Sequence, residues 1–207
     1  MIPSRRTPIL LLLGLSLTAC VPGGDMPTTR IDQRTDRGAV GMGLDNRDFT
    51  EAAGELVRDM LESGRLERPG GGRYVLAISR IRNDTQLRMN TDELISKVRI
   101  DLNNSGRTIT TTAVGLSGPE DPMAIQSRQL RMSGEFNQRT VAARGQMVAP
   151  DLSLSGSIIQ RNNRVDGGAM RIDYTFRLVL TEIRTGLAFW EGERVISRQG
   201  SGRTVAW

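Results

Sequence analysis

Hydrophobic residues between positions 49 and 61 recur at the spacing of an α-helix. Seven of them fall at i, i+3, i+4, i+7, i+8, i+11 and i+12, which places them on one face (Phe49, Ala52, Ala53, Leu56, Val57, Met60, Leu61). Asp48 suits the N-cap, Glu51 would complete a capping box, and Gly64 suits a left-handed stop. The pattern predicts an amphipathic helix over residues 48–63. Because its polar face carries more acid than base, we expect it to pack on the domain's own sheet and not on a membrane.

A strand, a second helix and another strand are predicted next. Residues 73–82 alternate around apolar positions and are bounded by three glycines and a polar turn, which is typical of a strand. A helix is expected to begin at Asn90, with Glu93 three residues later, and to end near Gly106. One row of its apolar side chains should face the core (Leu94, Ile95, Val98, Leu102). A strand over residues 107–114 follows. The three glycines precede a strand and lack a following Gly-Lys-Ser/Thr, so they do not predict a phosphate-binding loop.

The segment from Gly115 to Pro150 has the weakest pattern. Asp121-Pro122 predicts the start of a helix, since proline at the first helical position loses no hydrogen bond. One or two further helical turns over residues 137–148 would place four small or apolar residues on one face (Val141, Ala142, Gly145, Val148).

After Pro150 the hydrophobic period changes to two. The alternation predicts three antiparallel strands, around residues 152–158, 171–180 and 188–196. Turn residues lie in both connections (Asn162-Asn163 and Gly167-Gly168, then Arg184-Thr185-Gly186). Four of the eight aromatic residues lie in this meander and are expected in the core (Tyr174, Phe176, Phe189, Trp190). The element order predicts an α/β (α+β) domain, with a mixed β-sheet flanked by helices and a C-terminal antiparallel meander.

The first twenty residues have the pattern of an export signal. Arg5 and Arg6 precede an apolar run over residues 9–17, which is too short for a bilayer span of about twenty residues. The run ends in Leu17-Thr18-Ala19-Cys20, which resembles a bacterial lipobox. We therefore expect residues 1–19 to be a lipoprotein signal peptide and Cys20, the only cysteine, to be acylated. Because Val21 stands where an Asp commonly retains such lipoproteins in the inner membrane, the expected location is the outer membrane, lipid-anchored on its periplasmic side.

A tether is expected between this anchor and the domain. Residues 20–46 are rich in Pro and Gly and then alternate Arg with Asp, without apolar periodicity. The residues after Cys20 span at most about 85 Å when extended, and roughly 28 Å root-mean-square as flexible coil. The globular domain is expected over residues 47–207.

Composition excludes several classes of function. The chain has no histidine, which removes the commonest metal ligand and the usual general base. Ser96 and Lys97 are neighbours on a predicted helix and point in different directions, so they cannot act as nucleophile and base. The net charge of +5 loses Arg5 and Arg6 with the signal, which leaves +3, and the arginines are scattered and mostly alternate with acids. We expect no catalytic residue, cofactor, metal, nucleic acid or small-molecule substrate.

Several segments of the predicted domain match a known family. YVLAISRIRNDT over residues 74–85, followed by NTDELISKVR over residues 90–99, resembles the signature of the LpoB family, the lipoprotein activators of penicillin-binding proteins. The helix 48–63, LSLSG at 152–156 and RIDYTFRLVLTEIRTGLAFWE at 171–191 agree in order and spacing, so the likeness covers about residues 48–198. It implies a fold similar to the N-terminal domain of TolB.

The resemblance also implies a function. Members of the family are non-enzymatic regulators that sit on the outer membrane, bind a bifunctional class A penicillin-binding protein and stimulate peptidoglycan synthesis. A second interpretation keeps the fold and makes the protein a TolB-like or curli-secretion-like lipoprotein that assembles into an envelope complex. For the activator, the candidate contact with the synthase is the polar segment Arg82, Asn83, Asp84 and Thr85, inside the best-matching motif. The same residues also suit a plain turn.

Overall fold

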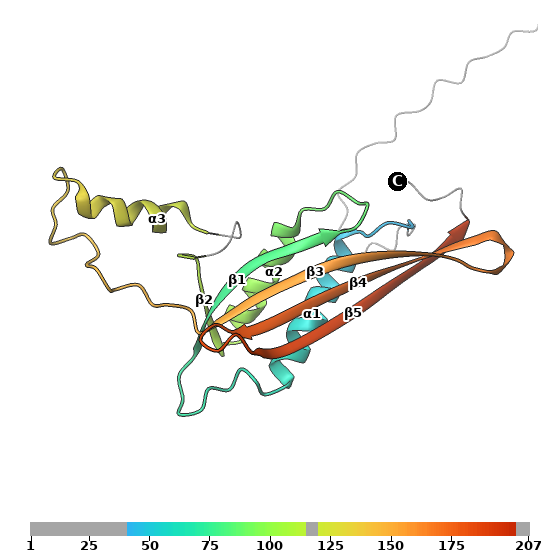
Figure 1. The fold of residues 1–207 in the computed structure, drawn as a ribbon, viewed down its shortest axis with the longest axis horizontal. Coiled ribbons are helices and arrows are strands. Elements are labelled where there is room, and N and C mark those ends of the chain that lie inside the picture. Colours follow the sequence, from blue (N-terminus) through green and yellow to red (C-terminus); the bar gives the residue numbers. More distant parts are fainter. Residues whose placement is uncertain (1–40, 115–119, 202–207) are drawn as a thin grey trace, which may run out of the picture. The chain divides into compact units, whose positions relative to one another are not determined.

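The computed structural model describes residues 41–114 and 120–201. The predicted signal peptide, Cys20 and the tether up to residue 40 lie outside the described residues. The elements are α1 Asn46–Glu62, β1 Tyr74–Asp84, α2 Thr91–Asn104, β2 Thr108–Thr111, α3 Pro122–Gln129, β3 Leu152–Arg164, β4 Ala169–Glu182 and β5 Ala188–Ser201 (Figure 1). Two short 3₁₀ turns, η1 Leu130–Met132 and η2 Asp166–Gly168, complete them. None of the helices in these ranges is long and apolar enough to cross a membrane.

One five-stranded mixed sheet organises the domain, in the order β2-β1-β3-β4-β5. β1 runs parallel to both β2 and β3, whereas β3, β4 and β5 form an antiparallel meander. α2 packs against β1 and β2, and α1 packs against α2 and β5. The predicted fold class, a mixed sheet with helices and a C-terminal meander, is confirmed.

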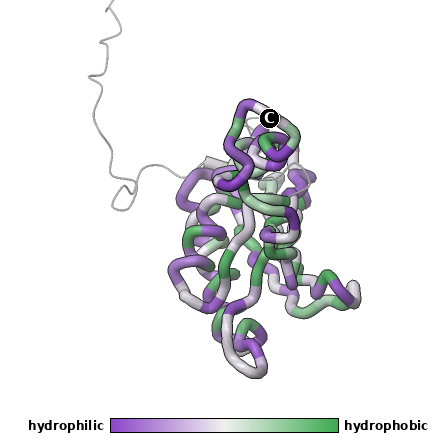
Figure 2. The backbone as a smooth tube through the Cα atoms, turned by 90° about the vertical axis from the view of Figure 1, so that its left-hand side faces the viewer, coloured by the Kyte–Doolittle hydropathy of each residue, from purple (hydrophilic) through white to green (hydrophobic). Residues whose placement is uncertain are grey.

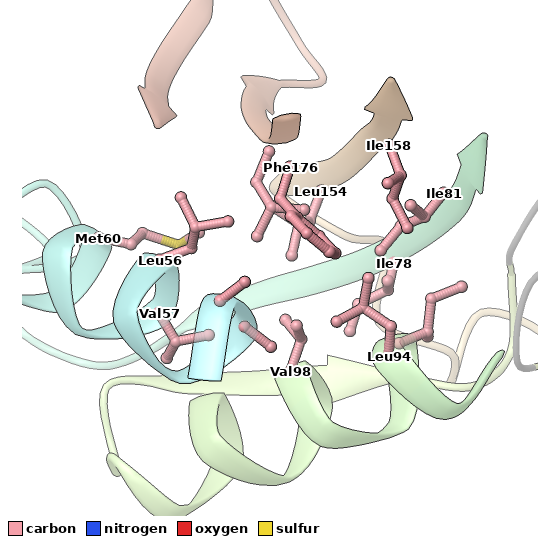
Figure 3. Packing of buried hydrophobic residues seen from close by; sticks show 14 of the residues in the cluster. Leu56, Val57, Met60, Ile78, Ile81, Leu94, Val98, Leu154, Ile158 and Phe176 are labelled. Carbon is pink, nitrogen blue, oxygen red and sulfur yellow. The ribbon is translucent and has the colours of Figure 1, made fainter. Parts of the chain in front are cut away.

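The core lies between the sheet and helices α1 and α2. Figure 3 shows Leu56 and Met60 of α1 and Val98 of α2 pointing toward side chains of the strands. A register shift between Ile78 and Ile81 in β1 lets both side chains face the helices although they are three residues apart, and each is only 2% exposed. Along β4 every second residue is buried (Ile172, Tyr174, Phe176, Leu178, Leu180). Figure 2 shows hydrophobic and hydrophilic residues interspersed along the chain. Of the four aromatic residues predicted in the core, Tyr174 and Phe176 are fully buried, and Phe189 and Trp190 pack partly buried against it.

The first helix begins one turn earlier than predicted. Its N-cap is Asp45, whose Oδ1 accepts hydrogen bonds from the backbone N–H groups of Arg47 and Asp48. The Asp48 carboxylate accepts in turn from the Asp45 N–H, so the capping box joins Asp45 to Asp48. The prediction of Asp48 as the cap, with Glu51 completing the box, was therefore wrong by three residues. Gly64 has a φ of 70°, and the predicted left-handed stop is confirmed.

The strands differ from prediction mainly in length. β2 covers only Thr108–Thr111 of the expected 107–114. β3 and β4 pair as far as Arg164 and Met170, so Asn162 and Asn163 belong to β3 and not to the connection. Cross-strand pairing over the whole length of both strands supplies hydrogen bonds that override the turn preference of these asparagines.

The connection from β2 to β3 contains one predicted helix and lacks another. α3 begins as expected at Pro122, and Asp121 caps it by accepting from the Met123 N–H. Residues 137–148 form turns instead of the expected helical turns. The Asn137 side chain accepts from the Arg139 N–H, and Gly145 has a φ of 79°, both of which compete with a helix.

Buried and half-buried charges join α1 to β5. Arg194 of β5 bonds to both Glu55 and Asp59, and Arg198 bonds to Asp48, a residue only 6% exposed. Burial lowers the pKa of Arg194, but the bonds to Asp59 and Glu55 outweigh this and raise it above its usual value. Arg194 and Arg198 thus lie on the side of β5 that faces α1, where apolar side chains would be usual.

The start of the described chain is bonded to the sheet next to these charges. The Tyr174 hydroxyl of β4 donates a buried hydrogen bond of 3.2 Å to the carbonyl oxygen of Met42. The Met42 side chain is 7% exposed and belongs to the core.

Candidate functional site

The four predicted contact residues lie at the end of β1. Because β1 extends to Asp84, the residues Arg82, Asn83 and Asp84 belong to the strand, and only Thr85 lies in the connection to α2. The prediction that all four form a loop was therefore wrong in its boundary. Pairing of residues 81–84 with β3 extends the strand past the expected end at residue 82.

Asn83 and Thr85 build the turn after the strand. The Asn83 Oδ1 accepts from the N–H and the hydroxyl of Thr85, at 3.1 and 2.8 Å. Its Nδ2 donates to the Leu87 carbonyl at 2.8 Å, and the Leu87 N–H donates to the Thr85 hydroxyl at 3.1 Å. The hydrogen bonds of these two side chains thus lie within the turn. This agrees with the interpretation that the segment forms a plain turn.

Arg82 and Asp84 face the other way. Side chains alternate along a strand, so both lie on the sheet face opposite Ile81 and the helices. Their ion pair joins Arg82 Nε and Asp84 Oδ2 at 2.7 Å, and the side chains are 71% and 40% exposed. They are the two exposed residues of the four candidates, whereas Asn83 and Thr85 are half-buried.

Strand register places further polar side chains beside this pair. Arg82 is in register with Ser157 of β3, which pairs with Arg177 of β4, which pairs with Glu193 of β5. Arg177 and Glu193 form an ion pair of 3.3 Å, and both side chains are more than half exposed. We call the surface made by Arg82, Asp84, Ser157, Arg177 and Glu193 the polar face. Sequence reasoning missed three of its members, although their period-two alternation marked them as outward residues.

A second polar group lies on the same side of the sheet nearer the β3–β4 turn, beyond the register row that holds Ile159 and Val195. The Ser197 hydroxyl and the Arg171 guanidinium both donate to the Asp173 carboxylate, and Asn163 donates to it as well. The bond from Ser197, followed by that from Arg171, holds the pKa of Asp173 below its usual range. The arrangement keeps Asp173 ionised and its neighbours fixed.

A groove of about 530 Å³ lies on the helix side of the same connection, between the starts of α1 and α2. Six of its lining residues are apolar (Leu44, Phe49, Leu87, Met89, Leu94, Ile100). Leu87 and Met89 come from the turn that Asn83 and Thr85 build. The end of β1 therefore contributes Arg82 and Asp84 to the polar face, and the connection that follows it contributes Leu87 and Met89 to the apolar groove on the helix side.

The residues that the structure describes form no metal-binding cluster: no group of three or more His, Cys, Asp or Glu side chains that could hold a metal occurs among them. The ammonium group of Lys97 forms an ion pair with the Asp101 carboxylate, one turn along α2, at 3.4 Å. The partner of Lys97 is thus Asp101 and not Ser96.

These observations define a mixed α/β domain with helices α1 and α2 on one face of the sheet and a charged, exposed surface on the other. Residues 48–196 match the family model described as peptidoglycan-synthase activator LpoB. The chain belongs to this family.

Solved structures give similar folds. The LpoB C-terminal domain from Salmonella enterica is 18% identical, over 72% of this chain and 98% of that chain, with a TM-score of 0.42. The NMR structure of Escherichia coli LpoB is 18% identical, over 97% of this chain and 88% of that chain, with a TM-score of 0.40. The PelC dodecamer from Paraburkholderia phytofirmans is 16% identical, over 64% and 76%, with a TM-score of 0.29. A search of curated proteins found no match.

Proposed function

We propose that this protein is an outer-membrane lipoprotein, anchored through Cys20 on the periplasmic side, that binds and activates a bifunctional class A penicillin-binding protein. Membership of the LpoB family supports activation of a peptidoglycan synthase. An activator of this kind needs no catalytic group of its own. It acts by binding the active conformation of the synthase more tightly than the inactive one.

The observation that carries a contact site is the polar face. Its side chains stand on a sheet and are held by ion pairs, so little conformational entropy is lost when a partner binds. Arginine is enriched at protein interfaces, and two arginines, Arg82 and Arg177, lie in one register row here. We therefore assign the synthase contact to Arg82 and Asp84 together with Arg177, and give Asn83 and Thr85 the role of positioning the strand end.

The test uses the mature chain, residues 20–207 with Cys20→Ser, as bait for detergent-solubilised envelopes. Capture of a class A penicillin-binding protein, followed by faster glycan polymerisation and cross-linking by that synthase, is the expected result. The double variant Arg82→Ala/Arg177→Ala should bind at least about fivefold more weakly, since the few residues that dominate an interface, among which arginine is enriched, each cost more than about 1 kcal/mol when truncated. Arg184→Ala is the matched control, because Arg184 is an exposed arginine of the β4–β5 turn whose side chain is 83% exposed.

A variant of the groove separates the two surfaces that meet at this connection. Met89→Ser alters the apolar groove and leaves the polar face intact. Loss of synthase binding by Met89→Ser, with normal binding by Arg82→Ala/Arg177→Ala, would move the contact to the helix side and refute the assignment.

The alternative function is assembly into an envelope complex. One observation favours it: among the described strands β5 pairs only with β4, so β5 is an edge strand, and an edge strand can pair with another chain. Charged residues along β5, including Glu191 and Glu193, oppose such pairing. Sedimentation of the lipid-free mature chain decides between the two: a monomer supports the activator, and a stable ring supports assembly.

A further inference from the structure

The segment between β2 and β3 exposes an unusual share of apolar side chains. Among the described residues, six of the twelve large hydrophobic residues that are exposed lie within residues 122–150, which we call the insert (Met123, Ile125, Met132, Phe136, Met147, Val148). Met132 is 82% exposed and Val148 is 69% exposed. Neither α3 nor η1 buries any residue. The insert thus presents apolar groups to its surroundings and does not use them in a core.

The insert is also basic. It holds four arginines, Arg128, Arg131, Arg139 and Arg144, against a single acid, Glu135. Arg128 and Arg131 donate to backbone carbonyl oxygens of Ala113 and Ala142 and keep their positive charge while bracing the segment. Arg139 and Arg144 are exposed.

Two acids directly precede the insert, Glu120 and Asp121. Asp121, which precedes the insert, caps α3 through its bond from the Met123 N–H. Glu120 lines a pocket at the sheet together with Ala77 and Ser79. Within residues 122–150 the arginines outnumber the acids by three, and with Glu120 and Asp121 included they outnumber them by one.

Exposed apolar groups interspersed with arginines suit an anionic bilayer surface. Apolar side chains are stabilised at the boundary between headgroups and acyl chains, and arginines are stabilised beside phosphate groups. A protein partner would require a fixed surface of complementary shape. The exposed apolar residues of the insert are instead distributed over a helix, a 3₁₀ turn and a stretch of turns and irregular chain, which a fluid surface accommodates and a rigid one does not.

We propose that the insert binds anionic phospholipid headgroups, with Phe136, Met132 and Val148 entering the interface and Arg139 and Arg144 contacting phosphates. The proposed anchor at Cys20 would hold the domain close to a bilayer, at a distance set by the length of the tether. In that respect alone the inference rests on the proposed function. The insert then supplies a second, reversible attachment beside the lipid.

Vesicle sedimentation tests the proposal without the anchor. The mature chain, residues 20–207 with Cys20→Ser, is mixed with vesicles of phosphatidylcholine alone or of equal parts phosphatidylcholine and phosphatidylglycerol. Binding is expected only to the anionic vesicles and should weaken as the salt concentration rises. The variant Arg139→Gln/Arg144→Gln should bind about 25-fold more weakly, since each arginine near an anionic surface contributes roughly fivefold. Met132→Ser/Phe136→Ser should also weaken binding.

The β4–β5 turn provides the matched control. Arg184→Gln/Leu187→Ser removes one charge and one apolar group that are similarly exposed but lie outside the insert, and it should bind as the unaltered chain does. Circular dichroism checks that every variant keeps its fold. The proposal is overturned by absence of binding to the anionic vesicles, by equal binding to both vesicles, or by unchanged binding of both insert variants. Loss of synthase capture by the insert variants, without any vesicle binding, would assign the insert to a protein partner instead.

Discussion

Gly156 lies where β3 approaches β4 too closely for any side chain. A Cβ built at Gly156 would sit 2.5 Å from the carbonyl oxygen of Arg177 and 2.8 Å from Leu178 Cδ2. Leu178 can change rotamer, but the carbonyl oxygen belongs to the backbone of the paired strand. Gly156→Ala therefore forces the two strands apart at the centre of the sheet.

The size of the effect follows from two opposing contributions. Overpacking a closely packed site costs about 1–3 kcal/mol. Alanine also lowers the conformational entropy of the unfolded chain relative to glycine, which stabilises the folded state by roughly 0.4–1 kcal/mol. We expect Gly156→Ala to lower the free energy of unfolding by about 1–2 kcal/mol. Gly54 is the matched control: it lies inside α1, a Cβ there meets nothing within 4 Å, and Gly54→Ala should raise stability by about 0.8 kcal/mol.

Urea unfolding followed by circular dichroism measures both changes. The two variants carry the same chemical substitution, so their midpoints should move in opposite directions relative to the unaltered protein, with similar slopes. If Gly156→Ala unfolds at the same urea concentration as the unaltered protein, or at a higher one, then β4 does not press on Gly156 and the reasoning fails.

Three further predictions concern charge and anchoring. Arg198→Met leaves the buried Asp48 carboxylate without its partner and should cost about 3 kcal/mol in urea unfolding; a loss below about 1 kcal/mol would show that water replaces the arginine. Because the pKa of Asp173 is lowered in the folded state, its stabilising contribution is present above about pH 4 and is lost as the pH falls further. The difference in urea midpoint between the unaltered protein and Ser197→Ala should therefore shrink from pH 7 to pH 3, and a constant difference would contradict this. Cys20→Ser should move the protein from the membrane fraction to the soluble fraction of fractionated cells, whereas continued membrane retention would refute the anchor.

Periodicity predicted the elements whose apolar rows are long. The row from Phe49 to Leu61 and the alternation of β4 located α1 and the meander correctly, because each residue's environment follows from its neighbours along the chain. Element ends were less predictable. Asp45 and Asp48 are both good caps, and only the geometry of the folded turn selects Asp45.

The candidate site was predictable only in part. Arg82 and Asp84 were identified, but their neighbours Arg177 and Glu193 depend on the register between strands that are far apart in sequence. The same limit applies to α1. The sequence showed an acidic polar face on that helix and could not show that Arg194 of β5 would lie against it.

The position of the Tyr174 hydrogen bond decides how the domain responds to a mechanical load. If the domain is anchored through Cys20 as proposed and held by a partner, the force enters through the chain that precedes Gly41. The first groups to receive this force are Met42, bonded to Tyr174 of β4, and Asp48, bonded to Arg198 of β5. Tension thus reaches β4 and the edge strand β5 from residues at and just before the first turn of α1. Arg82 lies on β1 and the Asn83 turn follows from that strand, which takes part in neither bond, whereas Arg177 of the proposed synthase contact lies on β4 and would receive the load.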